Sequence, residues 1–315
     1  MGSAHTDADP SAWLGRSSSP AVDEWVRRHL EPTGPLTLEH DRAWATVLRV
    51  PLASGEAAWF KHCKPLQAFE PRLTAGLAAR WPDRVTEVIA WDDERQWLLL
   101  ADAGTPFGAF GNAPEAWEAI LPRYAELQIG ETSHADDHLA GGVPDLRAQV
   151  LPERYDDMLS RGDLPLDPRD VEALVAFEPR FAELCDQLAS DGVAPSIQHD
   201  DLHIANVYAK GDVLRVLDWG DSSVAHPFFS LFETFRFLEG VNKLPRDDPW
   251  FGRLRDAYLE PWGSDTETFA RALRLSSFAR VFAWIRQRDA LEGDERTQFD
   301  VWFPDVLRYA VAATS

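Results

Sequence analysis

The pattern of apolar and polar residues divides the chain into three parts, of which the first is short. Residues 1–19 are polar and rich in Ser, Ala and Asp, so we expect a flexible N-terminus with little to bury. A helix is expected next, because Ser19 is a good N-cap residue and Pro20 suits the first helical turn. The apolar positions that recur on one face of this helix are Val22, Trp25, Val26 and Leu30.

The second part, up to about residue 102, has the alternation that is typical of strands. Turn residues separate the apolar runs, and Glu70 and Pro71 open one helix that stops before Pro82. The strands expected from these runs are 36–38, 44–50, 57–61, 85–91 and 96–100. The pattern therefore predicts an antiparallel sheet interrupted by one helix.

The third part is mostly helical. The helices expected there are 114–127, 168–190, 228–238, 265–288 and 296–312. One β-hairpin, with strands at 206–208 and 213–217, is the only interruption that the pattern predicts. A small sheet lobe followed by a larger helical lobe is an α+β arrangement, so we expect a flexible N-terminus (1–19), an N-lobe (20–102) and a C-lobe (103–315).

Composition narrows the classes of partner. The 315 residues carry a formal net charge of −21, which would repel nucleic acid and anionic membranes and would weakly favour a cationic small molecule. Two isolated cysteines make neither a disulfide framework nor a zinc site. We see no signal peptide and no apolar run that could span a membrane, so we expect a cytoplasmic protein, either monomer or homodimer.

Candidate chemistry gathers around the hairpin. Asp201 and Asn206 precede its first strand, and Asp218 follows its second. A hairpin brings its two ends together, so these three side chains should form one compact site with two carboxylates and one amide oxygen. Oxygen ligands of this kind suit Mg²⁺, which binds through one or two carboxylates together with substrate phosphates.

This segment resembles the signature of the aminoglycoside phosphotransferase family, within the protein-kinase-like superfamily. The family pattern is His-Gly-Asp-Leu-His-x-x-Asn, followed about a dozen residues later by Asp-Trp-Gly. The matching residues here are His199, Asp201, Leu202, His203, Asn206, Asp218, Trp219 and Gly220. The resemblance implies a bilobal kinase-like fold and a phosphotransferase that uses ATP, or another nucleoside triphosphate, with Mg²⁺. It makes Asp201 the catalytic base and Asn206 and Asp218 the metal ligands.

The resemblance also assigns a nucleotide site in the N-lobe. In this superfamily a strand Lys binds the α- and β-phosphates and pairs with a helix Glu, and here Lys61 and Glu70 occur in that order. The backbone from Leu100 to Asp102 corresponds to the hinge that binds adenine.

Three departures from the family are visible. The loop 39–43 lacks glycines, the usual Asp-Pro pair after Asp-Trp-Gly is His226-Pro227, and the second position of the signature is Asp200 rather than Gly. Asp200 could contact a cationic substrate or face solvent. The short segment after Asp218 contains no activation loop, which argues against a protein kinase.

The acceptor is open at this stage. We expect a cationic antibiotic or amino sugar held by acidic residues, with Asp200, His203 and Asp221 as the first substrate-site candidates. The other acidic candidates are Glu233, Glu239, Asp289, Glu292, Asp294 and Glu295. Two alternatives remain: a non-catalytic nucleotide-binding module, and a metal-dependent hydrolase that uses His199, Asp201 and His203 as zinc ligands.

Overall fold

The first helix forms where the sequence predicts it. The structure, a computed structural model, describes residues 18–211 and 213–314, so most of the expected flexible N-terminus lies outside the described residues. Helix α1 (Pro20–Arg27) begins after Ser19, whose hydroxyl accepts a hydrogen bond from the Val22 amide. Val22, Trp25 and Val26 are buried, which confirms the predicted apolar face.

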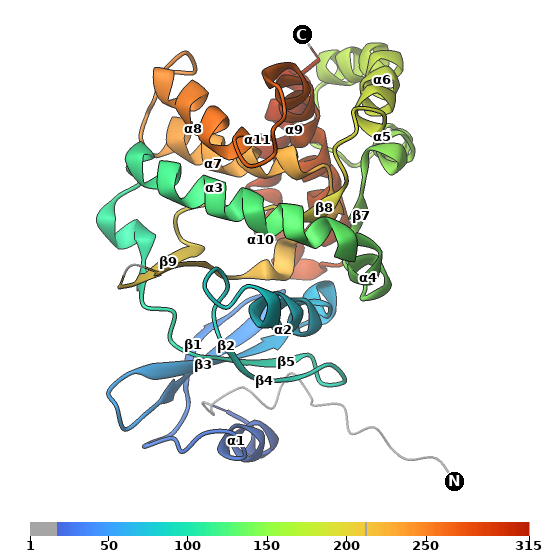
Figure 1. Cartoon of the computed structure of the whole chain (residues 1–315). Helices are drawn as coiled ribbons and strands as arrows, with labels where there is room; N and C mark the ends of the chain where they lie inside the picture. The colour runs from blue at the N-terminus through green and yellow to red at the C-terminus, as the bar shows by residue number, and fades with distance from the viewer. Residues whose placement is uncertain (1–17, 212, 315) are drawn as a thin grey trace.

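The predicted sheet is present and has five strands in the order β1-β2-β3-β5-β4, with antiparallel neighbours. Helices α1 and α2 lie on opposite faces of it (Figure 1). The strands are β1 (Thr37–Asp41), β2 (Ala45–Pro51), β3 (Ala57–Cys63), β4 (Val88–Asp92) and β5 (Trp97–Leu100). Strand β3 continues two residues beyond Lys61, so Lys61 lies inside the strand rather than at its end.

Alternation along β3 decides where Lys61 points. Phe60 is fully buried in the core that α1 forms with the sheet, where its ring lies 5.9 Å from that of Trp25. Successive side chains of a strand point to opposite faces, so Lys61 and Cys63 lie on the other face, towards α2. The apolar pattern of β3 therefore places Lys61 on the side of the sheet that faces the C-lobe.

Helix α2 (Glu70–Arg80) joins the two lobes. Its Leu73 and Leu77 belong to the apolar core of the C-lobe rather than to that of the N-lobe. Arg80 makes a two-pronged interaction with the fully buried Glu131 of α3 (Pro114–Glu131), with both N–O distances at 2.6 Å. Glu70, at the start of this helix, is thus held in register with the C-lobe.

The C-lobe is mainly helical, as predicted. Its remaining helices are α4 (Ala135–Ala140), α5 (Leu151–Leu159), α6 (Pro168–Ala189), α7 (Leu231–Gly240), α8 (Pro249–Leu259), α9 (Thr266–Asp289), α10 (Gly293–Asp300) and α11 (Phe303–Ala312). The single helix expected over 296–312 is wrong. The chain turns at Val301 and Trp302, and Pro304 opens a new helix because it cannot donate the hydrogen bond of a continuing one.

The prediction of a single β interruption is also wrong. The hairpin of β9 (Val207–Lys210) and β10 (Val213–Val216) is present, but β6 (Thr105–Pro106) pairs with β9. A second small sheet has the order β7-β11-β8 and consists of β7 (Asp145–Leu146), β8 (Ser196–Gln198) and β11 (Ser223–Ala225). Strands of two or three residues carry no readable period, and their pairing partners are distant in sequence. The segment that follows β5 is thus held against the hairpin by the pairing of β6 with β9.

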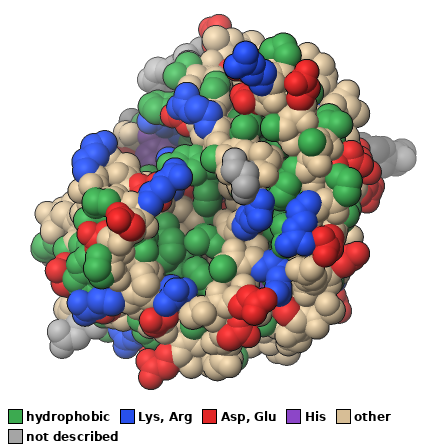
Figure 2. Space-filling view, turned by 90° about the horizontal axis from the view of Figure 1, so that it is seen from above, with side chains coloured by type: hydrophobic (Ala, Val, Ile, Leu, Met, Phe, Trp, Pro, Cys, Tyr) green, Lys and Arg blue, Asp and Glu red, His purple; other side chains and the backbone are tan. Residues whose placement is uncertain are grey.

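The surface of the C-lobe is not uniformly acidic. Figure 2, which looks down on the end of this lobe opposite the sheet, shows Lys and Arg side chains intermingled with Asp and Glu around a hollow that exposes apolar side chains. This face therefore carries charges of both signs, although the whole chain has a net charge of −21. None of the helices within the described residues has the length and apolar character needed to cross a bilayer.

Candidate functional site

The loop between β8 and β9 carries the residues of the signature, and His199 braces it. The fully buried His199 ring donates from Nε2 to the Leu217 carbonyl at 2.7 Å, and its Nδ1 accepts from the Asp201 amide at 3.3 Å. Both ring nitrogens are thus engaged by backbone. These contacts brace the loop and leave neither ring nitrogen of His199 to act as the zinc ligand that the hydrolase hypothesis requires.

Residue 200 adopts a left-handed backbone conformation, with φ of +63°. Gly enters this region freely, while Asp and Asn tolerate it better than other residues with a side chain. This explains both the Gly of the family pattern and the Asp that replaces it here. The Asp200 side chain is 5% exposed and accepts a hydrogen bond from Gln198 Nε2 at 2.9 Å, so the expectation that it could face solvent is wrong.

Asp201 lies at the centre of a group of polar contacts. One carboxylate oxygen accepts from His203 Nε2 and from Asn206 Nδ2, both at 3.1 Å. The other oxygen accepts from Arg280 Nη2 at 3.0 Å. Burial raises the pKa of Asp201, but His203 and Arg280 outweigh burial and hold that pKa well below its ordinary value. Asp201 is therefore an ionised carboxylate near neutral pH.

Arg280 was missed by the sequence reasoning. It comes from α9, its side chain is 4% exposed, and besides Asp201 its guanidinium approaches Glu233 at 2.9 Å and Asp200 at 4.0 Å. The signal that could have revealed it is local: Arg280 is the one charged residue of the otherwise uncharged stretch Leu275–Ala283, and every residue of this stretch is buried. A buried arginine needs acidic partners, and the structure supplies them from the β8–β9 loop (Asp200 and Asp201) and from α7 (Glu233).

Lys61 connects the two lobes. Its ammonium lies 2.6 Å from Glu70 Oε2 and 2.6 Å from Asp218 Oδ1, so one cation joins the sheet, α2 and the segment after the hairpin. Burial lowers the pKa of Lys61, but Asp218 and Glu70 raise it well above its ordinary value. Asp218 has a left-handed backbone, with φ of +64°, which turns its side chain towards this ammonium.

A cavity of about 440 Å³ lies between the lobes and contains these groups. Lys61, Glu70, Asn206 and Asp218 all line it, together with the backbone segment from Leu100 to Gly104. Apolar walls come from both lobes, with Val47 of β2 on one side and Leu217 and Tyr208 beside the hairpin on the other. The cavity thus has apolar walls near the segment Leu100–Gly104, which connects the lobes, and charged side chains at its other end.

The structure adds cavity residues that the sequence reasoning did not single out. His40 and Trp44, from the segment around the β1–β2 turn, line the charged end and the wall. Burial is the largest cause that lowers the pKa of His40, and the nearby Arg42 lowers it further. The sequence analysis noted this turn, residues 39–43, only for its lack of glycines and assigned no site residue to it.

Asn206 and Asp218 offer a fitting site for Mg²⁺. Asn206 Nδ2 donates to the Asp201 carbonyl at 3.0 Å, which leaves its amide oxygen to face the same cavity as the Asp218 carboxylate. Two protein oxygens beside a phosphate-sized space match a cation that keeps several waters. The described residues contain no cluster of three or more His, Cys, Asp or Glu side chains that could hold a metal, so the hydrolase hypothesis gains no support.

The three substrate-site candidates, Asp200, His203 and Asp221, are all in contact with other side chains of the protein. Asp221 Oδ1 accepts hydrogen bonds from Gln67 Nε2 at 3.2 Å and Gln287 Nε2 at 2.9 Å, which ties the N-lobe to α9. Burial, then Asp201, raises the pKa of Asp221 to about 6, while burial raises that of Asp200 to about 7 against the opposing effect of Arg280. The ring of His203, the third candidate, lies flat against that of the half-buried Phe237, with 4.3 Å between the ring centroids.

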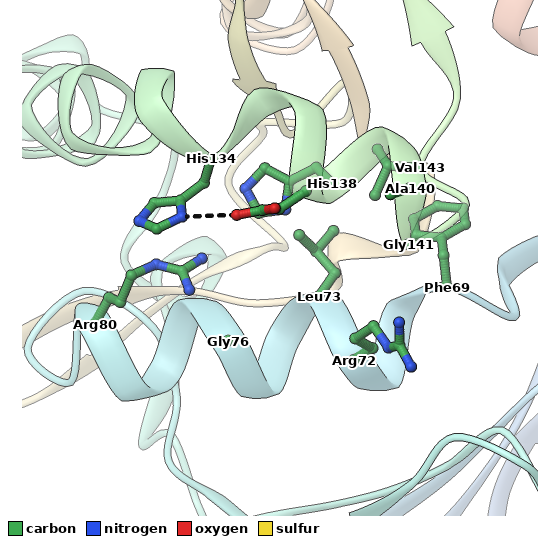
Figure 3. A pocket seen from close by; sticks show the side chains of 11 residues that line it. Phe69, Arg72, Leu73, Gly76, Arg80, His134, His138, Ala140, Gly141 and Val143 are labelled. Atoms are coloured by element: carbon green, nitrogen blue, oxygen red, sulfur yellow. Dashed lines mark hydrogen bonds and ion pairs between the residues drawn. The ribbon is translucent and has the colours of Figure 1, made fainter.

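A second cavity, of about 340 Å³, lies between α2 and α4 (Figure 3). Its arginine and histidine side chains already have acidic partners: Arg72 contacts Asp93, Arg80 and His138 contact Glu131, and His134 contacts Asp137. We interpret this cavity as part of the lobe junction rather than as a ligand site.

No protein-family model matches the chain, and no curated protein matches it in sequence. Solved structures do match its fold. Macrolide 2′-phosphotransferase MphH from Brachybacterium faecium is 17% identical, with 89% of this chain and 96% of that chain covered at a TM-score of 0.60. A choline/ethanolamine kinase family protein from Mesorhizobium loti is 16% identical, with 96% and 98% covered at a TM-score of 0.55. Spectinomycin phosphotransferase APH(9)-Ia, solved with ADP and spectinomycin, is 14% identical, with 94% and 98% covered at a TM-score of 0.53.

These likenesses extend over nearly the whole length of each chain. They show that the protein has the bilobal α+β fold of protein-kinase-like small-molecule kinases, which confirms the fold expected from the signature. Identities below 20% establish the fold and leave activity to be argued from the site.

Proposed function

We propose that the protein is a phosphotransferase that moves the γ-phosphate of a nucleoside triphosphate, ATP in the first instance, to a hydroxyl group of a small molecule. The observation that carries the proposal is the Lys61 ammonium, which contacts Glu70 of α2 and Asp218 of the C-lobe inside one interlobe cavity. Asn206 lines the same cavity, and its side-chain amide donates a hydrogen bond to Asp201 at 3.1 Å. The fold neighbour solved with ADP supports a nucleotide as the occupant.

In this proposal the chain divides the work among its residues. The backbone from Leu100 to Asp102 binds the base, and Lys61, held by Glu70, contacts the α- and β-phosphates. Asn206 and Asp218 hold Mg²⁺, which neutralises charge on the phosphates when it is bound. This arrangement requires the direct contact between Lys61 and Asp218 to open when nucleotide enters.

Asp201 is the proposed catalytic base. The acceptor oxygen forms a bond to the γ-phosphorus, the bond from that phosphorus to the β–γ bridging oxygen breaks, and the nucleoside diphosphate leaves with the electron pair. The hydroxyl proton passes to Asp201. The contacts from His203, Asn206 and Arg280 fix the orientation of this carboxylate, and positioning of this kind is the main source of rate in phosphoryl transfer.

Two variants test the proposal. Asp201→Asn should abolish turnover, measured as ADP release over a panel of hydroxylated acceptors, while Mg·ATP still stabilises the protein against heat. Asp218→Ala should lose most of the Mg·ATP-dependent stabilisation, because a charged metal ligand is removed. An exposed carboxylate variant, Asp247→Asn, serves as the control and should change neither readout.

The alternatives give different results. Full turnover in Asp201→Asn contradicts the base assignment. Strong Mg·ATP binding by a wild-type protein with no turnover on any acceptor favours the non-catalytic nucleotide-binding module. Stoichiometric zinc, with activity that needs no Mg²⁺, favours the hydrolase. Comparison of ATP with GTP in the binding assay determines the nucleotide preference.

A further inference from the structure

The acidic residues nearest to Asp201 are already engaged within the protein. Glu233 forms ion pairs with Arg280 at 2.9 Å and with Arg236 at 2.7 Å, and only 3% of its side chain is exposed. Asp200 is buried against Arg280, and Asp221 is held by two glutamines. Carboxylates that are buried and paired in this way have little capacity left to recognise a cationic ligand.

One face of α7 leads from this buried cluster to the surface. Residues 233, 236, 237 and 240 fall at the spacing that places them on one side of a helix. Glu233 contacts Arg280, and Phe237 stacks on His203, so this face meets two of the three side chains that contact Asp201. The Arg236 guanidinium lies 5.0 Å above the Phe237 ring, one side chain further out.

A cavity of about 320 Å³ begins at Arg236. It is lined by Arg236, Arg246, Asp305, Arg308, Tyr309 and Ala312, which come from α7, the following loop and one face of α11. Three arginines and one carboxylate line it, in a chain that has 31 Lys and Arg against 52 Asp and Glu. The charge of this cavity is therefore opposite in sign to that of the whole protein.

The two outer arginines are available to a ligand. Arg246 and Arg308 are 71% and 73% exposed, and their contacts with Glu239 and Asp305 are exposed ion pairs, which stabilise a protein very little. Exchanging such a contact for a ligand anion is therefore inexpensive. The planar guanidinium also matches the two oxygens of a carboxylate or phosphate, which it can bind with two parallel hydrogen bonds.

We propose that this cavity is an anion subsite for the acceptor, so the acceptor carries a carboxylate or phosphate group in addition to the hydroxyl that receives phosphate. The inference rests on the proposed function. It replaces the cationic acceptor that we expected from net charge and from the acidic candidates. Asp200, Asp221 and Glu233, the candidates nearest to Asp201, are paired internally, and arginines outnumber carboxylates in the cavity beside α7.

The test uses a matched set of polyols as probes. D-Glucose, D-glucosamine, D-gluconate and D-glucose 6-phosphate share a hydroxylated skeleton and differ in charge. Thermal stabilisation of the full chain is measured with each probe at constant ionic strength. The anionic probes should raise the melting temperature more than glucose or glucosamine. A response to gluconate alone identifies a carboxylate subsite, and a response to the 6-phosphate alone identifies a phosphate subsite.

Two variants locate the response. Arg246→Gln and Arg308→Gln should each weaken the apparent affinity for the anionic probe about tenfold, the usual effect of losing one charge-assisted hydrogen bond. Both side chains are exposed, so the fold should tolerate either change. The matched control is Arg180→Gln. Arg180 is another exposed arginine and forms an i,i+3 pair with Glu183 on α6, so its removal should leave the anion response unchanged.

Three results would overturn the inference: a wild-type response that is equal for charged and uncharged probes, a preference for glucosamine, or an anion response that survives in both arginine variants. Mg·ATP binding, measured in the same preparations, reports separately on the proposed function. Normal Mg·ATP binding without an anion response refutes the subsite and leaves the kinase proposal standing. If the wild type does not bind Mg·ATP, the kinase proposal is refuted. In that case an anion response that is present in the wild type and absent from both arginine variants still supports the subsite.

Discussion

Replacing Asp200 tests whether burial of an acidic side chain in the candidate catalytic loop lowers the stability of the protein at neutral pH. Its carboxylate is 5% exposed, one of its oxygens has no hydrogen-bond partner, and burial raises its pKa to about 7. The variant Asp200→Asn keeps the shape of the side chain, and its amide oxygen can still accept from Gln198. Asn also tolerates the left-handed backbone of this position, so the substitution changes charge with little change in geometry.

The expected effect follows from the two pKa values. In the unfolded chain the pKa of Asp200 lies near its ordinary value of 3.8, and in the folded protein it is about 7. The folded pKa is raised, so the stability linked to this group is fully present below about pH 4 and is lost as pH rises towards 7. A difference of about 3 pH units, at about 1.4 kcal/mol per unit, sets an upper limit of about 4 kcal/mol.

Asp200→Asn should therefore be more stable than the wild type at pH 8 by up to a few kcal/mol, and the difference should shrink towards pH 5. Urea unfolding at pH 5, 6, 7 and 8 measures this. Asp247→Asn, which removes an exposed charge, is the control for the change in net charge and should show no such dependence. A stability difference that is constant with pH, or a variant less stable than the wild type at pH 8, would refute the reasoning.

Two further predictions concern packing around the site. Arg280→Met removes the buried cation that Glu233 and Asp201 share, so it should cost about 3–5 kcal/mol of unfolding free energy. Arg253→Met, which breaks an exposed pair with Glu118, should cost under about 1 kcal/mol. Equal costs in urea unfolding would contradict the role given to Arg280. Gly104→Ala would place a Cβ 2.2 Å from the Ala209 carbonyl oxygen, while Gly111→Ala meets open space at a similar positive φ. The first should therefore cost about 1–3 kcal/mol more than the second and weaken nucleotide binding at the hinge, and equal stability of the two variants would count against the close approach of hinge and hairpin.

The sequence determined the features that depend on local chemistry. Alternation along 57–61 placed Phe60 and Lys61 on opposite faces of a strand, and the structure has them so. Hairpin spacing predicted that Asn206 and Asp218 would lie close together. Both line the same cavity, and the amide of Leu217, next to Asp218, donates to the Asn206 carbonyl at 2.9 Å. The signature predicted the fold, which the solved structures confirm. Each of these conclusions needed only neighbouring residues and the period of one element.

Only the tertiary structure decided which charges are free. Arg280 lies 79 residues from Asp201 in sequence, and no local pattern shows that it pairs with that carboxylate and with Glu233. Asp200 and Glu233, which seemed available in the sequence, are buried beside Arg280, and the arginines that remain accessible come together from α7, a loop and α11. Sequence lists the charges of a protein, but their partners are fixed by which elements pack together, and those partners decide what a site can bind.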